Sequence, residues 1–330
     1  MSQKPHLLVE IGADAPCPIT AVHAISRVPP DVGFHDKRGM RAPAGIYNIS
    51  LGRICPRMTR CCAEIERLFR ADLEKTSEYS TIEEAVADSL EQMLFAAAEH
   101  ADDMENLASG FFATHALAKR DPRFREFSNR VDKLRSLTSN MANKIKHNQA
   151  RLRFYALQFQ HDHIHQVAHG FFIEGVNRGV IGPHVAVHSK QRVFSLTAIA
   201  WEVATLVLRV SNALNRFCSF FAQSQDAKSK ATCKTFLDAV RAAARLPAYA
   251  FGEEHPFSQL DFRIVADESE KSAMDSGLYG SINHRWIKSA AFAPGPHRMS
   301  FKGDGSARQF DLVYPDKLEL VQWNLSTQAS

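Results

Sequence analysis

Asn143 and His147 are the residues of this sequence whose types and spacing best suit chemistry. They stand four positions apart in the stretch NKIKHN, so on a helix they lie on one face, one turn apart. Histidine transfers protons near neutral pH, an amide can orient it, and lysine or arginine stabilises a charged phosphorane. Because the ribose 2′-hydroxyl supplies the nucleophile, RNA cleavage needs no metal. The stretch therefore predicts His147 as acid or base and Asn143 as its orienter.

The same residues also suit the C-terminal end of an ordinary surface helix. Lys144, Lys146 and His147 would interact favourably with the helix dipole, and their side chains would cap the last carbonyl groups. The two interpretations differ in whether another cationic side chain reaches the imidazole of His147.

Further basic residues are candidates for contacts with phosphate. Arg151 and Arg153 follow the stretch at alternate positions. Arg209 and Arg216 belong to a polar stripe on an otherwise apolar helical segment, where an internal salt bridge between Glu202 and Arg209 is the alternative. The candidate phosphate or RNA contacts are Lys144, Lys146, Arg151, Arg153, Arg209 and Arg216.

A run of histidines, HDHIHQVAHG, offers a second kind of chemistry. On one continuous strand His161, His163 and His165 would share a face, and three imidazoles there could bind zinc or manganese in a metal-dependent hydrolase. No further ligands follow in a recognisable pattern, so we expect no metal. Walker, GxGxxG, GxSxG and HExxH motifs are also missing from the sequence, and we expect no cofactor.

The helix that must position NKIKHN is clearly marked. Asp121 is a good N-cap, and Pro122 suits the first helical position. Apolar residues then recur at spacings of three and four and predict one buried stripe: Phe124, Phe127, Val131, Leu134, Leu137, Met141 and Ile145.

The rest of the chain predicts a mainly α (α+β) protein. Residues 1–52 hold a strand at HLLVEIG and an irregular segment with a short strand at AGIYNISL. Residues 53–249 form a helical bundle, with a capping box at Ser80 and Glu83 and an apolar central helix from Arg192 to about Gln223. A small antiparallel β insert occupies about 151–190, with PHVAVHS as a strand, and residues 250–330 are β-rich.

Charge is distributed unevenly along the chain, although the net charge is only +4. Between Glu64 and Glu105 thirteen acids face three bases, and between Lys119 and Arg153 eleven bases face three acids. One interpretation is that helix faces of opposite sign pack side by side. The other is that the basic segment meets phosphate.

The stretch NKIKHN resembles the signature of HEPN (higher-eukaryote and prokaryote nucleotide-binding) proteins. Asn143 matches that family's polar residue and His147 its histidine, but the family's arginine position falls on Ala142. The resemblance implies a HEPN-like helical bundle, RNA or nucleotide binding, and metal-independent endoribonuclease activity in prokaryotic defence, toxin–antitoxin or stress systems. It also implies pairing as a homodimer. Without the arginine, either another arginine completes the site or the chain is a catalytically inactive interaction scaffold.

Partners and location follow from the same observations. We expect single-stranded RNA or a nucleotide as ligand and a second copy of the chain as partner, and a partner protein is a further candidate. The longest apolar run, Val193 to Leu208, carries Glu202 and is shorter than the roughly 20 residues of a membrane span, so no membrane role is expected. Six cysteines without a CxxC pair, and no signal peptide, predict reduced thiols in a cytoplasm.

Overall fold

Seven α-helices and a small antiparallel sheet dominate the described part of the chain. The structure is a computed structural model. It describes residues 5–8, 18–29, 31–74, 78–148, 150–161, 164–177, 180–188, 194–223, 233–251, 262–263, 279–284, 296–303, 306–313, 318–321 and 323–324. The prediction of a mainly helical protein is confirmed.

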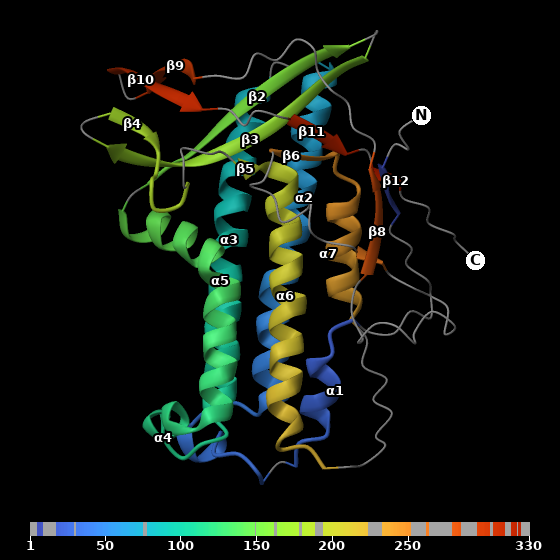
Figure 1. Ribbon diagram of the computed structural model, residues 1–330, viewed down its shortest axis with the longest axis vertical. Coiled ribbons are helices and arrows are strands. Elements are labelled where there is room, and N and C mark those ends of the chain that lie inside the picture. The colour runs from blue at the N-terminus through green and yellow to red at the C-terminus, as the bar shows by residue number, and fades with distance from the viewer. Residues whose placement is uncertain are drawn as a thin grey trace.

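The long helices run side by side and form an elongated bundle (Figure 1). A short 3₁₀ helix, η1 (Asp36–Arg38), precedes the first of them. The helices are α1 (Ala21–Ser26), α2 (Pro43–Glu74), α3 (Tyr79–Ser109), α4 (His115–Arg120), α5 (Pro122–Asn148), α6 (Leu196–Ser219) and α7 (Lys234–Ala244). In the part of the chain that the structure describes, no helix combines the length and apolar character needed to span a bilayer.

Helix α6 is the central helix, as its composition predicts. It contacts α1, α2, α3, α5 and α7, and Trp201 near its start is fully buried. The helix begins at Leu196 and not at Arg192, because Phe194 and Ser195 form the short strand β5, and the Ser195 hydroxyl caps Ala198 N at 3.3 Å. Because α6 is buried on most sides, it lies at the centre of the bundle's core.

Helix α2 corrects the expectation of an irregular segment up to residue 52. AGIYNISL is not a strand, because α2 begins at Pro43 and continues through Pro56. Tyr47, Leu51 and Ile54 are buried at helical spacing, and the Tyr47 hydroxyl donates to Ser211 of α6 at 3.1 Å. Packing against α6 therefore outweighs the strand preference of this short stretch.

Helix α3 begins one residue before the expected cap. Glu78 occupies the N-cap position and makes no side-chain capping hydrogen bond, so the predicted capping box at Ser80 and Glu83 is wrong. The helix ends at Ser109, and a separate helix, α4, starts after Thr114, whose hydroxyl accepts a hydrogen bond from Leu117 N.

The predicted antiparallel insert is present. Strands β2 (Leu152–His161), β3 (Ile164–Asn177) and β4 (Val180–Pro183) pair in that order, and β5 (Phe194–Ser195) joins β3. PHVAVHS is not a strand, since the chain turns after Pro183 and the backbone N–H of His188 donates to the carbonyl of His184 at 2.8 Å. The sheet lies across one end of the bundle, the upper end in Figure 1.

Short strands also occur near both chain ends. Strand β1 (Pro5–Leu8) lies between β12 and β8 in a sheet of order β12-β1-β8-β7. The others pair two by two, β9 with β10 and β6 with β11. Their bounds are β6 (Ala248–Phe251), β7 (Phe262–Arg263), β8 (Tyr279–His284), β9 (Pro296–Gly303), β10 (Ser306–Val313), β11 (Leu318–Val321) and β12 (Trp323–Asn324).

Candidate functional site

Helix α5 positions the predicted site, and its start is the one that the sequence predicts. An Asp121 carboxylate oxygen accepts hydrogen bonds from the backbone N–H groups of Arg123 (2.8 Å) and Phe124 (3.4 Å). Hydrogen bonding by Arg123 is the main reason that the pKa of Asp121 lies below its ordinary value. The predicted apolar stripe faces the core, with Phe124, Phe127, Val131 and Met141 buried. Leu134, Leu137 and Ile145 pack partly buried against it.

The acidic helix α3 lies between α2 and the basic helix α5. On one side, Arg135 of α5 forms ion pairs with Asp102 and Glu105 (3.4 Å) of α3, and with Asp132 of its own helix (2.7 Å). On the other, Arg53 and Arg57 of α2 lie 3.7 Å from acids of α3. The interpretation that helix faces of opposite sign pack side by side is confirmed. Each such exposed pair stabilises the fold by about 0–1 kcal/mol.

The polar stripe at the end of α5 is exposed. Asn140, Asn143 and His147 point away from the core, and no described residue forms a hydrogen bond or ion pair with the His147 side chain. The helix ends at Asn148, where the backbone N–H of Ala150 donates to the carbonyl of Lys144 at 3.3 Å. Asn143 and His147 therefore share an open face, as predicted.

The two lysines of NKIKHN lie to either side of this stripe. The ammonium of Lys146 stands 5.0 Å from the ring centroid of Phe95 on α3, a cation–π contact. Lys144 lies near His184 in the turn after β4. Burial, and then the positive charge of Lys144, hold the pKa of His184 below its ordinary value.

Arg151 and Arg153 occupy different surroundings. Arg151 is exposed and lies beyond the end of α5, so it does not continue the helical stripe. Arg153 forms an ion pair with Glu174 at 3.0 Å, and both side chains are mostly buried, with 15% and 11% of their surface exposed. The guanidinium of Arg153 is thus paired inside the β2–β3 ribbon, and this disfavours the predicted contact with phosphate.

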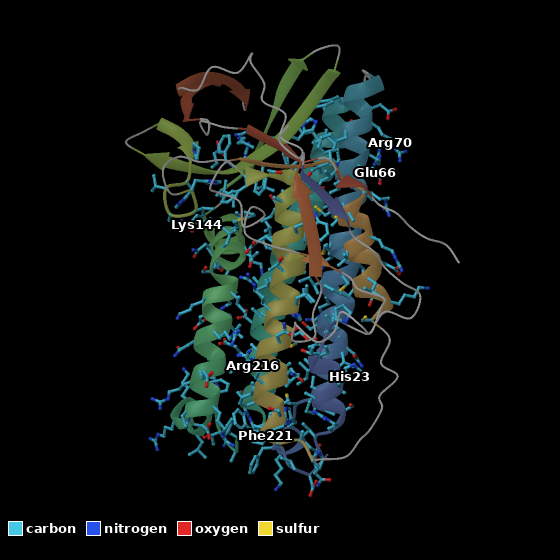
Figure 2. All side chains as sticks on the ribbon, turned by 45° about the vertical axis from the view of Figure 1, so that its right-hand side comes forward. His23, Glu66, Arg70, Lys144, Arg216 and Phe221 are labelled. Carbon is cyan, nitrogen blue, oxygen red and sulfur yellow. The ribbon has the colours of Figure 1, made fainter. Side chains whose placement is uncertain are left out.

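Arg209 and Arg216 do not approach His147. Helix α6 has 24 residues, which span about 36 Å, and Arg216 lies near its far end. Figure 2 shows Lys144 toward the upper end of the bundle and Arg216 toward the lower end. Arg209 lies on the middle turns, where its charge opposes the burial that raises the pKa of Glu202. These positions disfavour the hypothesis that Arg209 or Arg216 completes the site within one chain.

Ala142 explains why no arginine accompanies the motif. Only 2% of its surface is exposed, and it follows the fully buried Met141 on the core side of α5. An arginine side chain at this position would have to bury its guanidinium in an apolar core, which is strongly unfavourable without a partner. Within the described chain, His147 and Asn143 therefore stand without a motif arginine.

The histidine run does not form one strand face. Strand β2 ends at His161 and β3 begins at Ile164, and these two residues pair across a hairpin, with His165 opposite Gln160. His163 lies outside the described residues. Among the residues that the structure describes, no three histidine, cysteine or acidic side chains could together hold a metal ion. The continuous strand on which the metal hypothesis depended is absent.

Sequence reasoning missed two polar features of the bundle. One is a buried contact between Ser50 of α2 and His100 of α3, whose Oγ and Nδ1 atoms lie 2.9 Å apart. The other is a half-open pocket of about 420 Å³ between α3, α4 and α5. Its walls come from three consecutive helices, and the sequence pattern of each helix does not show how the three pack together. The pocket is lined by Glu105, His115, Lys119, Phe124, Arg125, Ser128, Asn129 and Asp132.

The end of α5 thus presents polar and basic side chains to the solvent. It offers an imidazole, two amides and several cations on one open surface, and it lacks a guanidinium beside the imidazole. Comparison with protein-family models, with curated proteins and with solved structures finds no match to this chain.

Proposed function

We propose that this chain is a HEPN-like helical module that binds single-stranded RNA through the C-terminal end of α5. The observation that carries the proposal is the exposed stripe of Asn140, Asn143 and His147, whose polar groups are accessible to a ligand. Amides and a histidine on such a surface can donate hydrogen bonds to phosphate and to base edges.

The surrounding charge supports the same ligand. Lys144, Lys146 and Arg151 form no ion pair with any described residue, whereas many arginines along the bundle are paired. Unpaired cations beside a polar stripe attract the phosphates of a flexible single strand and release counterions when they bind it. The imidazole of His147 is exposed on the same surface as these cations.

Within one chain the module is catalytically incomplete. His147 can move a proton and Asn143 can orient it, but Ala142 leaves the charge of a phosphorane without a guanidinium. We therefore favour the interaction module over the nuclease. Metal-independent cleavage is the second candidate, favoured by the exposed position of His147 and Asn143 one turn apart. A second copy of the chain would then have to supply the arginine. The HEPN resemblance is the basis for assigning either activity to a prokaryotic defence, toxin–antitoxin or stress system.

RNA binding is tested by changing three bases around the C-terminal end of α5 and, as a control, three bases in its first half. We expect Lys144→Ala, Lys146→Ala and Arg151→Ala together to weaken binding of a labelled single-stranded RNA. They should also reduce the slope of log affinity against log salt by about 2, since each lost contact removes about 0.7. Fluorescence anisotropy across a salt series measures both quantities.

The matched control removes the same charge from the first half of the same helix. In it, Arg125, Arg130 and Lys133 are changed to alanine, and the salt slope should stay as in the unchanged chain. Equal effects from the two triple variants would mean that net charge alone attracts RNA. Incubation with RNA in EDTA separates the two candidates, because cleavage that disappears in His147→Ala would establish the nuclease.

A further inference from the structure

Three segments far apart in the sequence meet at the lower end of the bundle, the end opposite to the β2–β3 sheet (Figure 1). They are residues 27–29 with 31–41, residues 110–126 and residues 216–223, and we call them together the lower end. Backbone hydrogen bonds join them: Phe34 N donates to Gly110 O at 2.8 Å, and Gln223 N donates to Arg27 O at 3.1 Å.

Aromatic contacts join residues 110–126 to residues 216–223. The ring of Phe221 stacks on Phe111 with centroids 4.5 Å apart. The Arg123 guanidinium lies 5.0 Å from the Phe221 ring and 5.8 Å from the Phe220 ring. The three segments therefore pack together and form one continuous surface. Figure 2 shows Phe221 and Arg216 toward this end of the bundle.

Several large apolar side chains are exposed to solvent on this surface. Phe220 is 60% exposed, Leu117 47% and Val32 36%, and each comes from a different one of the three segments. Only Ile49 and Val185 are comparable among the described residues. Exposed apolar side chains on three segments that pack together favour a surface that meets a partner.

The same surface is basic. Its three segments contain nine bases and four acids, and Arg123 is the base that pairs with Asp121. Seven bases are exposed or half-exposed and form no ion pair with a described residue: Arg27, Lys37, Arg41, Lys119, Arg120, Arg125 and Arg216. Along the middle of the bundle, in contrast, arginines of α2 and α5 face acids of α3.

We propose that the lower end docks on the surface of an anionic lipid bilayer. Phe220, Leu117 and Val32 enter the headgroup region, while the unpaired lysines and arginines contact lipid phosphates and carboxylates. Two of the three exposed apolar side chains are aliphatic. They have no planar face on which a nucleobase could stack, and this favours lipid over RNA. The chain lies on the membrane and does not cross it.

The test is sedimentation of the full chain with vesicles of phosphatidylcholine alone and of phosphatidylcholine with phosphatidylglycerol. We expect the chain to sediment with the anionic vesicles and not with the neutral ones. Phe220→Ser and Leu117→Ser should each reduce the bound fraction. Changing Lys119 and Arg120 to alanine should lower the partition coefficient about fivefold for each base removed.

Matched variants control for changes in general surface character. Val185→Ser removes an equally exposed apolar side chain from the sheet end, and it should leave vesicle binding unchanged. Changing Arg130 and Lys133 to alanine removes two charges from the middle of α5 and should do little. Far-ultraviolet circular dichroism verifies that each variant is folded.

Three outcomes would overturn the proposal. The first is equal binding to neutral and anionic vesicles, and the second is an effect of Val185→Ser as large as that of Phe220→Ser. The third is loss of RNA binding in the lower-end variants when the unchanged chain ignores anionic vesicles. That last result would make the surface a nucleic-acid contact and would leave the RNA proposal for the opposite end of α5 open to its own test.

Discussion

His100 combines complete burial with an ionisable ring in the middle of α3. Its Nδ1 atom lies 2.9 Å from Ser50 Oγ, and its Nε2 atom has no hydrogen-bond partner among the described residues. Burial lowers its pKa to about 4 from an ordinary value of 6.5. A neutral imidazole is therefore part of the folded state, and a charged one opposes it.

This burial predicts a loss of stability in mild acid. Between pH 6.5 and about 4 the unfolded chain binds a proton at His100 that the folded chain does not. The contribution of His100 to the free energy of unfolding should therefore be complete above pH 6.5, and it should be lost as the pH drops toward 4. The loss from this residue is about 3 kcal/mol, at 1.36 kcal/mol per pKa unit. Urea unfolding at several pH values measures it.

The variant His100→Leu isolates the contribution of that one ring. It should be less stable at pH 7.5, because the contact with Ser50 is lost, but its stability should depend less on pH. The remaining dependence belongs to groups such as His35, whose pKa is also lowered by burial. Identical pH profiles in the two proteins would contradict the assignment.

At the scale of elements, the end of α3 is held by side chains from the segment before α2. The carbonyls of its last turn have no partners within the helix. His35 Nε2 donates to Leu107 O at 2.9 Å, and the Arg38 guanidinium donates to Ser109 O at 2.5 Å. The ring of His35 lies directly against Gly110, where a Cβ atom would come within 2.4 Å of it. The close approach explains why α3 stops at a glycine.

Gly110→Ala should therefore destabilise the bundle. The added methyl would force the buried His35 ring from its place, at a cost of about 1–3 kcal/mol in the free energy of unfolding. Gly52→Ala is the matched control, since Gly52 lies inside α2 and a Cβ atom there would meet nothing within 4 Å. That change should stabilise the chain by about 0.5–1 kcal/mol. Chemical unfolding of both variants decides, and equal effects would refute the role of His35.

Elements with local signals could be predicted from the sequence, and elements fixed by distant contacts could not. Helix α5 carries its own cap at Asp121 and its own apolar stripe, so its bounds and buried face follow from the sequence. The start of α2 has no such signal. Its helical state depends on contacts such as that between Tyr47 and Ser211, which are separated by 164 positions.

The same distinction between local signals and distant contacts applies to the candidate site. The exposed face of Asn143 and His147 could be predicted, because it depends only on helical periodicity. The place of Arg216 could not, since it depends on the direction in which α6 returns after the β insert. The ion pair of Arg153 with Glu174 depends on the register of β2 and β3, and single-sequence patterns do not fix that register.

At the scale of the whole molecule, a hydropathy window detects membrane spans and misses surfaces assembled from separate segments. Phe220, Leu117 and Val32 belong to three segments that are far apart in the sequence, and only the fold brings these segments together at the lower end. The lack of a long apolar helix among the described residues concerns only segments that would span a membrane. It carries no information on whether the chain rests on one.

The buried thiols offer a test of whether the bundle unfolds as one unit. Cys61 on α2 and Cys218 on α6 are fully buried, and burial raises the pKa of each to about 12. Neither forms a disulfide. Because the thiolate is the reactive form, neither should be alkylated until its helix opens. Helix α6 packs against α1, α2, α3, α5 and α7. We therefore expect the thiols of Cys61 and Cys218 to become reactive at the same urea concentration.

Pulsed alkylation with iodoacetamide, read by mass spectrometry of the peptides, measures this directly. Coincident midpoints for Cys61 and Cys218, matching the loss of helical circular dichroism, are expected of a single cooperative core. Labelling of Cys218 at a clearly lower urea concentration would mean that α6 leaves the bundle first. The central position of α6 would then contribute less to stability than its burial indicates, because its contacts could open while the α2–α3 pair persisted.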